Sequence, residues 1–506
     1  MKKLSALCLL LSLLLLVQVV VLPVFATDVP EDTTAPDASN STPIGPAIAP
    51  QGQPLTVTDS DASVSHGCNS IDAQVPLGGS QKLLKTARAA ILFELNSGTL
   101  LYSYNPDARM EPAGLVKILT SLIVLEQGNL EREVTVTQTA LDTVPSGSID
   151  IDLCAGEVLT MEELLHGAMV GSGNDACAVI AETVSGSQEA FASLMNQRAK
   201  EIGCTASNFT NAHGLSDEEQ YTTARDMGRI LLFALQNEQF RELFGKTSYW
   251  IEKTEFSDSR YLMTSNYFMS KETGIVKFYD TRVTGGRTGS ISNDDRSMAC
   301  TAVSGDLNLM SIVMGCQAEF EADGYSLHRM GNFEETLDLL EWGFKYFSVN
   351  QVLNIGRSLS QLPVSNGSNH VTVRSVQSVD SAIPYGTTGD DLVWKYLLED
   401  GSLSAPVQKD VIVGAVQVWF GSICLAQSDM ITMNTSVVDT NLLDLGEDLQ
   451  GGQTEKSGLG IFLQGLGMVF AVIVVIIILF IALRLIRGAI IRARRRRRRM
   501  NRRRSH

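Results

Sequence analysis

The sequence predicts an α+β domain, followed by a small all-β domain and a C-terminal membrane-spanning helix. In the stretch AAILFELNSGTLLYSYN, two runs of strand-forming residues flank Asn96-Ser97-Gly98, and these turn residues favour a β-hairpin. Apolar residues then recur at helical spacing around 114–127, 160–183 and 187–202, and strand-like runs return at 297–304 and 308–316. Strands, then helices, then strands predict a sheet covered by helices over residues 85–346.

The pattern changes after Phe347 to short strand-like runs such as HVTVRSV and VIVGAVQVWF, separated by glycine and proline. Residues 347–440 are therefore predicted to form a separate β-rich domain. Two polar segments are predicted to be linkers. Residues 27–84 are rich in Thr, Pro, Asp and Ser and lack the apolar side chains needed for order, and residues 441–457 are rich in glycine and polar residues.

The two ends of the chain carry targeting signals. Residues 1–26 combine two lysines, an apolar run and a small-residue cleavage site, as in a secretory signal peptide, with an uncleaved anchor as the alternative. Residues 458–483 are apolar except for Gln464 and are long enough to cross a bilayer. The arginine-rich tail, 484–506, predicts a cytoplasmic C-terminus, and a nucleic-acid-binding arm is a weaker reading because the tail abuts the span. We therefore expect a single-pass protein of the cell membrane with its bulk outside the cytoplasm.

Charge and cysteine content narrow the possible partners. The net charge of −16 includes twelve arginines of the tail and two lysines of the signal, so the rest of the chain carries −30. An acidic ectodomain argues against nucleic acid as a partner. Seven cysteines remain after the signal, without the close spacing of a disulfide scaffold or a zinc site, and their redox state stays open. The sequence predicts neither a metal nor a cofactor.

Three short motifs stand in order within residues 85–346. They are Gly114-Leu115-Val116-Lys117 in RMEPAGLVKILT, Ser172-Gly173-Asn174 in GSGNDACAVIAE, and Arg287-Thr288-Gly289 in GGRTGS. In this order and setting they resemble the S-x-x-K, S-x-N and K-T-G motifs of the serine-type D-Ala-D-Ala carboxypeptidases, the low-molecular-mass penicillin-binding proteins. The resemblance implies a penicillin-binding/β-lactamase-like transpeptidase domain, and residues 347–437 resemble the domain that follows it in that family.

The first motif lacks the family's nucleophile. In an S-x-x-K helix the Ser and Lys share one face, and a Lys of lowered pKa takes the hydroxyl proton as the Ser attacks a carbonyl. Gly114 removes the attacking atom and leaves Lys117 without its partner; an ordinary loose helix start is the alternative reading. Thr120 and Ser121 lie farther along the helix and do not replace the missing hydroxyl.

The second motif supplies a hydroxyl and an amide. The resemblance implies that Ser172 shuttles a proton and that Asn174 grips the substrate backbone. A polar turn that caps the helix beginning near Asp175 is compatible with both roles. The resemblance places Ser172 on the opposite lip of the cleft, and the strict alignment needed for attack disfavours it as a replacement nucleophile.

The third motif departs from the family at its first position. Arg287 keeps the positive charge of the family's Lys, and its planar fork suits a C-terminal carboxylate, to which Thr288 would add a hydroxyl. The alternative is an Arg287 paired with Asp294 or Asp295. The resemblance also places the backbone N–H groups of Gly114 and Ser290 in the oxyanion hole.

Other catalytic signatures are missing from the sequence. It contains no H-E-x-x-H, no G-x-S-x-G and no phosphate-binding loop, and His213 in NAHGL is interpreted as structural. Two hypotheses remain. The first is a membrane-anchored, catalytically impaired family member at the peptidoglycan cell wall, which binds D-Ala-terminated stem peptides or β-lactam-like ligands. The alternative is an active carboxypeptidase that removes the terminal D-Ala during peptidoglycan maturation with another nucleophile.

Overall fold

The computed structural model describes residues 70–79, 82–272, 275–293, 295–320 and 327–439. The predicted signal peptide, membrane-spanning segment and basic tail, and most of the predicted linkers, lie outside these ranges. Within these ranges no helix combines the length and apolar character needed to span a bilayer.

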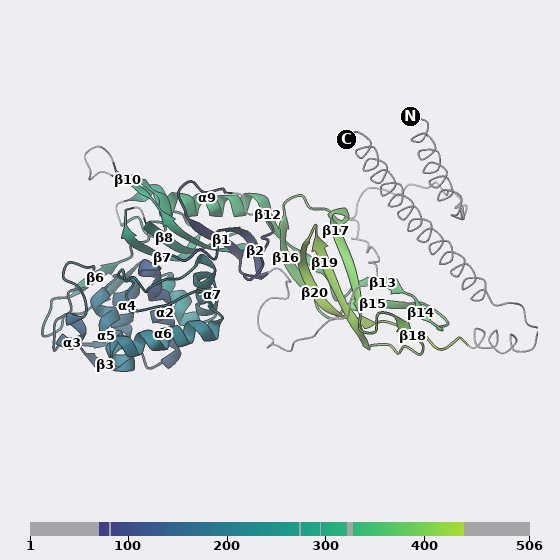
Figure 1. Ribbon diagram of the computed structural model, residues 1–506, viewed down its shortest axis with the longest axis horizontal. Coiled ribbons are helices and arrows are strands. Elements are labelled where there is room, and N and C mark those ends of the chain that lie inside the picture. Colours follow the sequence, from purple (N-terminus) through teal and green to yellow (C-terminus); the bar gives the residue numbers. More distant parts are fainter. Residues whose placement is uncertain (1–69, 80–81, 273–274, 294, 321–326, 440–506) are drawn as a thin grey trace, which may run out of the picture. The chain divides into compact units, whose positions relative to one another are not determined.

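An antiparallel sheet forms the centre of the first domain (Figure 1). Its strands follow the order β2-β1-β9-β8-β7, so the predicted hairpin lies at one edge and the strand with Arg287 at the other. Their bounds are β1 Ala89–Glu94, β2 Thr99–Tyr104, β7 Val283–Ser292, β8 Asp295–Ser304 and β9 Leu307–Cys316. The first and last parts of the domain therefore meet in one sheet, as β1 pairs with β9.

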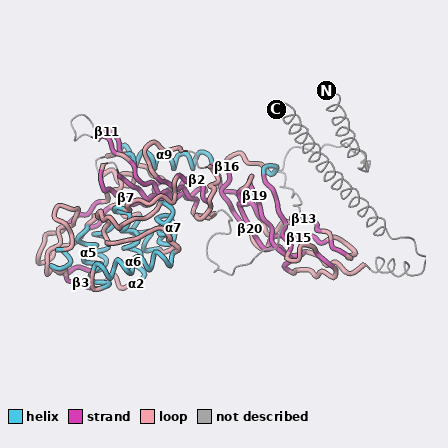
Figure 2. The backbone as a smooth tube through the Cα atoms, in the orientation of Figure 1, coloured by secondary structure: helices cyan, strands magenta, loops and turns pink. Residues whose placement is uncertain are grey.

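Helices cover both faces of this sheet (Figure 2). One face carries a helical layer whose apolar side chains form the main core with β1 and β9. The helices of this layer are α2 Val116–Gln127, α3 Gln138–Asp142, α4 Met161–Met169, α5 Asn174–Ser185, α6 Gln188–Ile202, α7 Ala224–Ala234 and α8 Glu238–Phe244. The long helix α9, Gly331–Tyr346, packs on β8 and β9 from the other face. The prediction of a sheet covered by helices is confirmed.

Short elements complete the domain. They are the 3-10 turns η1 Ala113–Leu115 and η2 Val276–Phe278, and the strands β3 Glu133–Thr135, β4 Val158–Thr160, β5 Ser248–Ile251, β6 Arg260–Met263, β10 Ala318–Phe320 and β11 Leu327–Met330. The strands pair as three hairpins or ribbons, β3 with β4, β5 with β6, and β10 with β11.

The single helical pattern over 160–183 is wrong, because α4 and α5 are separate helices there. The chain between them adopts backbone that no helix tolerates: Ser172 has φ of 63° and Gly173 has ψ of 120°. Side-chain periodicity did not reveal this break, because the apolar positions of both helices continue into the same core. The break brings the second motif to the start of α5.

The folded chain also begins earlier than the predicted boundary at residue 84. Ile71 and Leu77 are buried, and Leu77 donates its backbone N–H to the carbonyl of Leu100. Arg225 of α7 donates to the carbonyl of Ile71, and Arg229 pairs with Asp72. Backbone and ion-pair contacts thus hold a segment that has few apolar residues of its own.

Residues 347–439 fold mainly as β-strands. The main sheet of this region has the order β13-β15-β20-β19-β17, and smaller pairs join β12 with β16 and β14 with β18. The elements are β12 Phe347–Leu353, β13 Ser358–Leu362, β14 Val364–Ser365, β15 Val371–Ser375, β16 Val379–Pro384, η3 Gly389–Asp391, β17 Leu392–Leu398, β18 Leu403–Ser404, β19 Ile412–Phe420 and β20 Ile423–Thr432. Cys424 in β20 is disulfide-bonded, whereas Cys154, Cys177, Cys204, Cys300 and Cys316 are free thiols.

Candidate active site

The first motif lies where the chain turns into α2. Ala113 adopts a φ of 49°, unusual for a residue with a side chain, and Gly114 follows within η1. Gly214 makes this turn possible from the neighbouring loop. Its φ is 86°, and a Cβ there would lie 1.9 Å from the carbonyl oxygen of Ala113, so only glycine fits. Gly214 therefore packs directly against the backbone of Ala113 at the start of the helix.

Lys117 is the second residue of α2, and its side chain is almost fully buried, with 2% exposure. Its Nζ donates to Oδ1 of Asn174 at 2.7 Å and to the carbonyl oxygen of His213 at 2.9 Å. Burial lowers the pKa of Lys117 to about 8, with a further contribution from the nearby Arg287 cation. Lys117 is therefore a base whose proton can be removed near neutral pH.

The second motif occupies the break between α4 and α5. Asn174 is the first residue of α5, so its side chain points back toward Lys117. Asp175 fixes the turn from behind, because its carboxylate accepts the backbone N–H groups of Ile151 and Leu153. Ser172 is held with positive φ, and its Oγ faces the third motif.

The third motif lies on β7, the edge strand nearest η1. Alternation along the strand buries Gly285, Arg287 and Gly289 on the side of the helices. Arg287 is only 3% exposed. Its Nε donates to the carbonyl of Gly114 at 3.2 Å, its Nη1 to the carbonyl of Met169 at 2.9 Å, and its Nη2 to Oγ of Ser172 at 2.6 Å.

The guanidinium of Arg287 and the backbone of β7 together close on Gly114. A Cβ at Gly114 would lie 2.7 Å from the carbonyl oxygen of Thr288 and 3.4 Å from Nη2 of Arg287. The first of these distances is shorter than side chains tolerate against backbone. Gly114 therefore has no room for a Cβ in this structure.

Gly289 allows this close approach. A Cβ on Gly289 would meet both the side chain of Ala113 and the backbone nitrogen of Gly114 at 3.0 Å. Thr288 lies on the opposite face of the strand, and its Oγ1 is 2.7 Å from Oγ of Ser265. Ser290 is exposed, and its hydroxyl donates to the carbonyl of Ser292. Gly289, which precedes the predicted oxyanion residue Ser290, thus lies against the backbone of Gly114.

The charges of the site are unbalanced. Lys117 and Arg287 are both buried, and burial lowers the pKa of Arg287 to about 10. Within the described part of the chain no carboxylate pairs with either group. Asp295 pairs with Arg88 instead, and Asp294 lies outside the described residues. Cys177 lies near both cations, but it is fully buried and burial raises the pKa of its thiol, which keeps it protonated.

Several contacts of the site could not be found by motif reading. The carbonyls of Met169 and His213 act through the backbone, which leaves no trace in residue type. Ser265 follows β6 in an unremarkable stretch, with no spacing signal toward Thr288. His213 itself is 7% exposed, and burial lowers the pKa of its imidazole to about 3, so it is neutral. The ranges described hold no cluster of metal-ligating side chains.

The candidate site joins three elements. Lys117 lies at the start of α2, Ser172 and Asn174 lie at the start of α5, and Arg287 lies on the edge strand β7. These are the three motifs that resemble S-x-x-K, S-x-N and K-T-G, and the structure brings them together at one site. Residues 79–318 match the family model Peptidase_S11, D-alanyl-D-alanine carboxypeptidase. Residues 79–318 are therefore similar to the D-alanyl-D-alanine carboxypeptidases.

Individual relatives extend the likeness into the β-rich domain. The chain is 29% identical over 359 residues to D-alanyl-D-alanine carboxypeptidase DacA of Escherichia coli K12, covering 69% of this chain and 83% of that protein. It is 26% identical over 340 residues to DacF of Bacillus subtilis, covering 66% and 82%. Among solved structures, penicillin binding protein 5 of Haemophilus influenzae aligns with a TM-score of 0.55 and 27% identity, over 71% of this chain and 100% of that one.

Proposed function

We propose that this protein is a catalytically impaired family member that holds D-Ala-terminated stem peptides of peptidoglycan at the outer side of the cell membrane. The observation that carries the proposal is the double change at Gly114 and Arg287. The attacking side chain is missing, and the guanidinium and the carbonyl of Thr288 crowd the space where it would begin. The hydroxyl of Ser172, which the second motif contributes, accepts a hydrogen bond from Arg287.

The parts of the site that bind rather than react support a role in peptide recognition. Asn174 and Lys117 remain joined at 2.7 Å, and the backbone N–H groups of Gly114 and Ser290 do not depend on a side chain. Each terminal nitrogen of Arg287 carries a second hydrogen beyond the bond it already makes. A peptide carboxylate that reached these hydrogens would also balance two buried cations that lack an acidic partner among the described residues.

Membrane anchorage is the second part of the proposal and rests on the sequence. The apolar segment 458–483 has the length of a bilayer span, and the arginines after it favour a cytoplasmic tail. A site tethered at the outer side of the cell membrane would meet the stem peptides of the wall that lie close to the cell membrane.

The test of impaired catalysis is acylation. The purified ectodomain, incubated with a reporter penicillin, is expected to show an unchanged intact mass, because acylation needs a hydroxyl or thiol at the attack position. The Escherichia coli relative DacA serves as the matched reference. One acyl group on the ectodomain, mapped to Ser172 or to any other residue, would support the alternative of an active carboxypeptidase.

The test of binding is calorimetry with a peptide ending in D-Ala-D-Ala. Weak binding is expected, and Arg287→Ala or amidation of the peptide terminus should each abolish it, because both remove one partner of the carboxylate contact. Binding that survives both changes would assign Arg287 a purely structural role. A complete lack of peptide binding by the unmodified ectodomain would remove the proposed function.

A further inference from the structure

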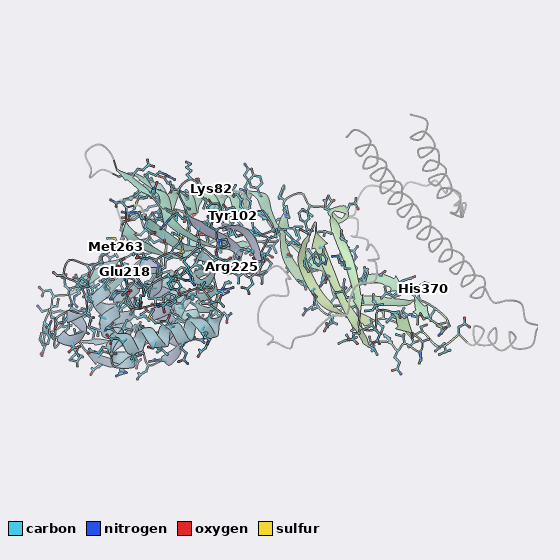
Figure 3. The ribbon with its side chains drawn as sticks, viewed as in Figure 1. Lys82, Tyr102, Glu218, Arg225, Met263 and His370 are labelled. Carbon is cyan, nitrogen blue, oxygen red and sulfur yellow. The ribbon has the colours of Figure 1, made fainter. Side chains whose placement is uncertain are left out.

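The β5–β6 hairpin presents an apolar surface that the fold does not use. Its inner face packs on the domain: Tyr249 stacks on His166 with ring centroids 3.8 Å apart, and Ile251 and Leu262 are buried. Its outer face, which we call the aromatic face, carries Trp250, Tyr261 and Met263. Trp250 and Tyr261 are each 51% exposed and Met263 is 38% exposed. Met263 is labelled in Figure 3.

The hairpin that carries the aromatic face lies beside the candidate site. Leu262 of the same strand lies beside Gly171, with its Cδ2 3.2 Å from the position of a Cβ there, and Gly171 precedes Ser172. After β6 the chain reaches Ser265, whose hydroxyl contacts Thr288 at 2.7 Å. Three residues lie between Tyr261 and Ser265, so their Cα atoms are at most about 14 Å apart.

We propose that the aromatic face binds the glycan backbone of the polymer whose stem peptide occupies the adjacent site. The proposal rests on the proposed function, and it adds a second subsite with its own ligand chemistry. A peptide of about five residues spans up to ~17 Å, which is enough to join a glycan on this face to a carboxylate at Arg287.

The side chains of the face fit a saccharide. The rings of Trp250 and Tyr261 are register partners with centroids 5.8 Å apart, tilted by 46°. Such ring faces accept the C–H side of a pyranose, while the hydroxyl edges of the sugar need polar neighbours. Exposed Glu252 precedes the turn of the hairpin, and Glu272 accepts a hydrogen bond from the hydroxyl of Tyr261.

Other occupants fit the face less well. About half of three large side chains amounts to ~300 Å² of apolar surface, well below the ~800 Å² that one partner contributes to a standard protein interface. An anionic lipid surface would need free basic residues. On the hairpin, Lys253 pairs with Asp258, and Arg260 pairs with the buried Glu157. A neutral polyhydroxy ligand meets neither objection.

The experiment is a titration of the full-length chain in detergent with chitotetraose, a β-1,4-linked N-acetylglucosamine oligomer that carries no peptide. Saturable binding is expected in calorimetry, with Trp250→Ala and Tyr261→Ala each weakening it at least tenfold. Trp250→Phe, which keeps an aromatic ring, should retain most of the affinity. Tyr385→Ala is the matched control, because Tyr385 is an aromatic residue with 79% exposure on the β-rich domain, and it should leave binding unchanged.

The outcomes separate this proposal from the proposed function. Chitotetraose binding that depends on Trp250, together with failure of the D-Ala-D-Ala peptide to bind, would overturn the proposed function and keep the glycan subsite. Absence of saturable binding to chitotetraose, or equal affinity in the wild type and the Trp250→Ala variant, would overturn the glycan subsite whatever the peptide does. A face that instead binds a protein partner and no saccharide would also overturn it.

Discussion

The two sides of the candidate site differ in what folding demands of them. On one side, buried Lys117 has to be satisfied by Asn174 and the carbonyl of His213, because a buried ammonium without acceptors costs several kcal/mol. On the other side, Gly114 has no side chain, and the carbonyl of Thr288 and the guanidinium of Arg287 lie where a Cβ would begin. Folding therefore requires polar partners around Lys117, whereas at Gly114 it requires the absence of a side chain.

The first prediction tests two obstacles to acylation separately. One is the missing hydroxyl at Gly114, and the other is the crowding of that position by Thr288 and Arg287. Gly114→Ser alone should give no penicillin adduct, because the new Cβ would meet the carbonyl of Thr288 at 2.7 Å and the guanidinium of Arg287 at 3.4 Å. Gly114→Ser combined with Arg287→Lys should form the adduct, because the new hydroxyl then lies near the base Lys117 with room to attack. Lysine cannot hold Gly114, Met169 and Ser172 at once in the planar manner of Arg287, so β7 gains freedom to move.

Intact mass measured over time is the readout for this pair of variants. Arg287→Lys alone is the control and should remain unreactive, since it restores no nucleophile. Equal acylation of the single Gly114→Ser variant and the double variant would show that Arg287 does not obstruct the site. An unreactive double variant that still folds and binds peptide would show that more than these two residues has diverged.

The second prediction concerns the base side and its dependence on pH. The pKa of Lys117 is lowered from 10.5 to about 8 by burial, so between these values the unfolded chain binds more protons than the folded chain. The free energy of unfolding should therefore rise as the pH increases from about 8 to about 10.5, by up to about 3 kcal/mol from this group. Below pH 8 both states are protonated and this contribution to the slope disappears.

Urea unfolding of the ectodomain at several pH values measures this contribution as a difference between variants. The slope should be smaller in Lys117→Met than in the wild type. Lys200→Met is the control, because Lys200 is exposed on α6, and it should leave the slope unchanged. An identical slope in the wild type and Lys117→Met would mean that Lys117 keeps an ordinary affinity for its proton in the folded state.

The difference between the two sides also explains what the sequence could predict. Linear motifs identified Lys117, Asn174 and Arg287, and helix and strand periodicity predicted the covered sheet, because both signals are local. The filling of the Gly114 position depends on Thr288, more than 170 residues away in the chain, and on backbone carbonyls that carry no sequence signal. The sequence did not predict the break between α4 and α5 for a related reason. The apolar residues of both helices pack into the same core, so the apolar pattern continues across the break.

The smallest effect is expected from Gly114→Ala. This variant is also the most direct test of how closely β7 packs against Gly114. Helix propensity alone predicts that alanine stabilises this position by up to about 1 kcal/mol. The contact of its Cβ with the carbonyl of Thr288 at 2.7 Å opposes this gain, because overpacking against the backbone typically costs 1–3 kcal/mol. We expect a net loss of about 1 kcal/mol in the free energy of unfolding. Gly356→Ala is the control, because a Cβ there meets only the side chain of Asn354, and it should be nearly neutral. If Gly114→Ala instead stabilises the domain, β7 has not closed on the helix start, and the missing side chain would be the only barrier to catalysis.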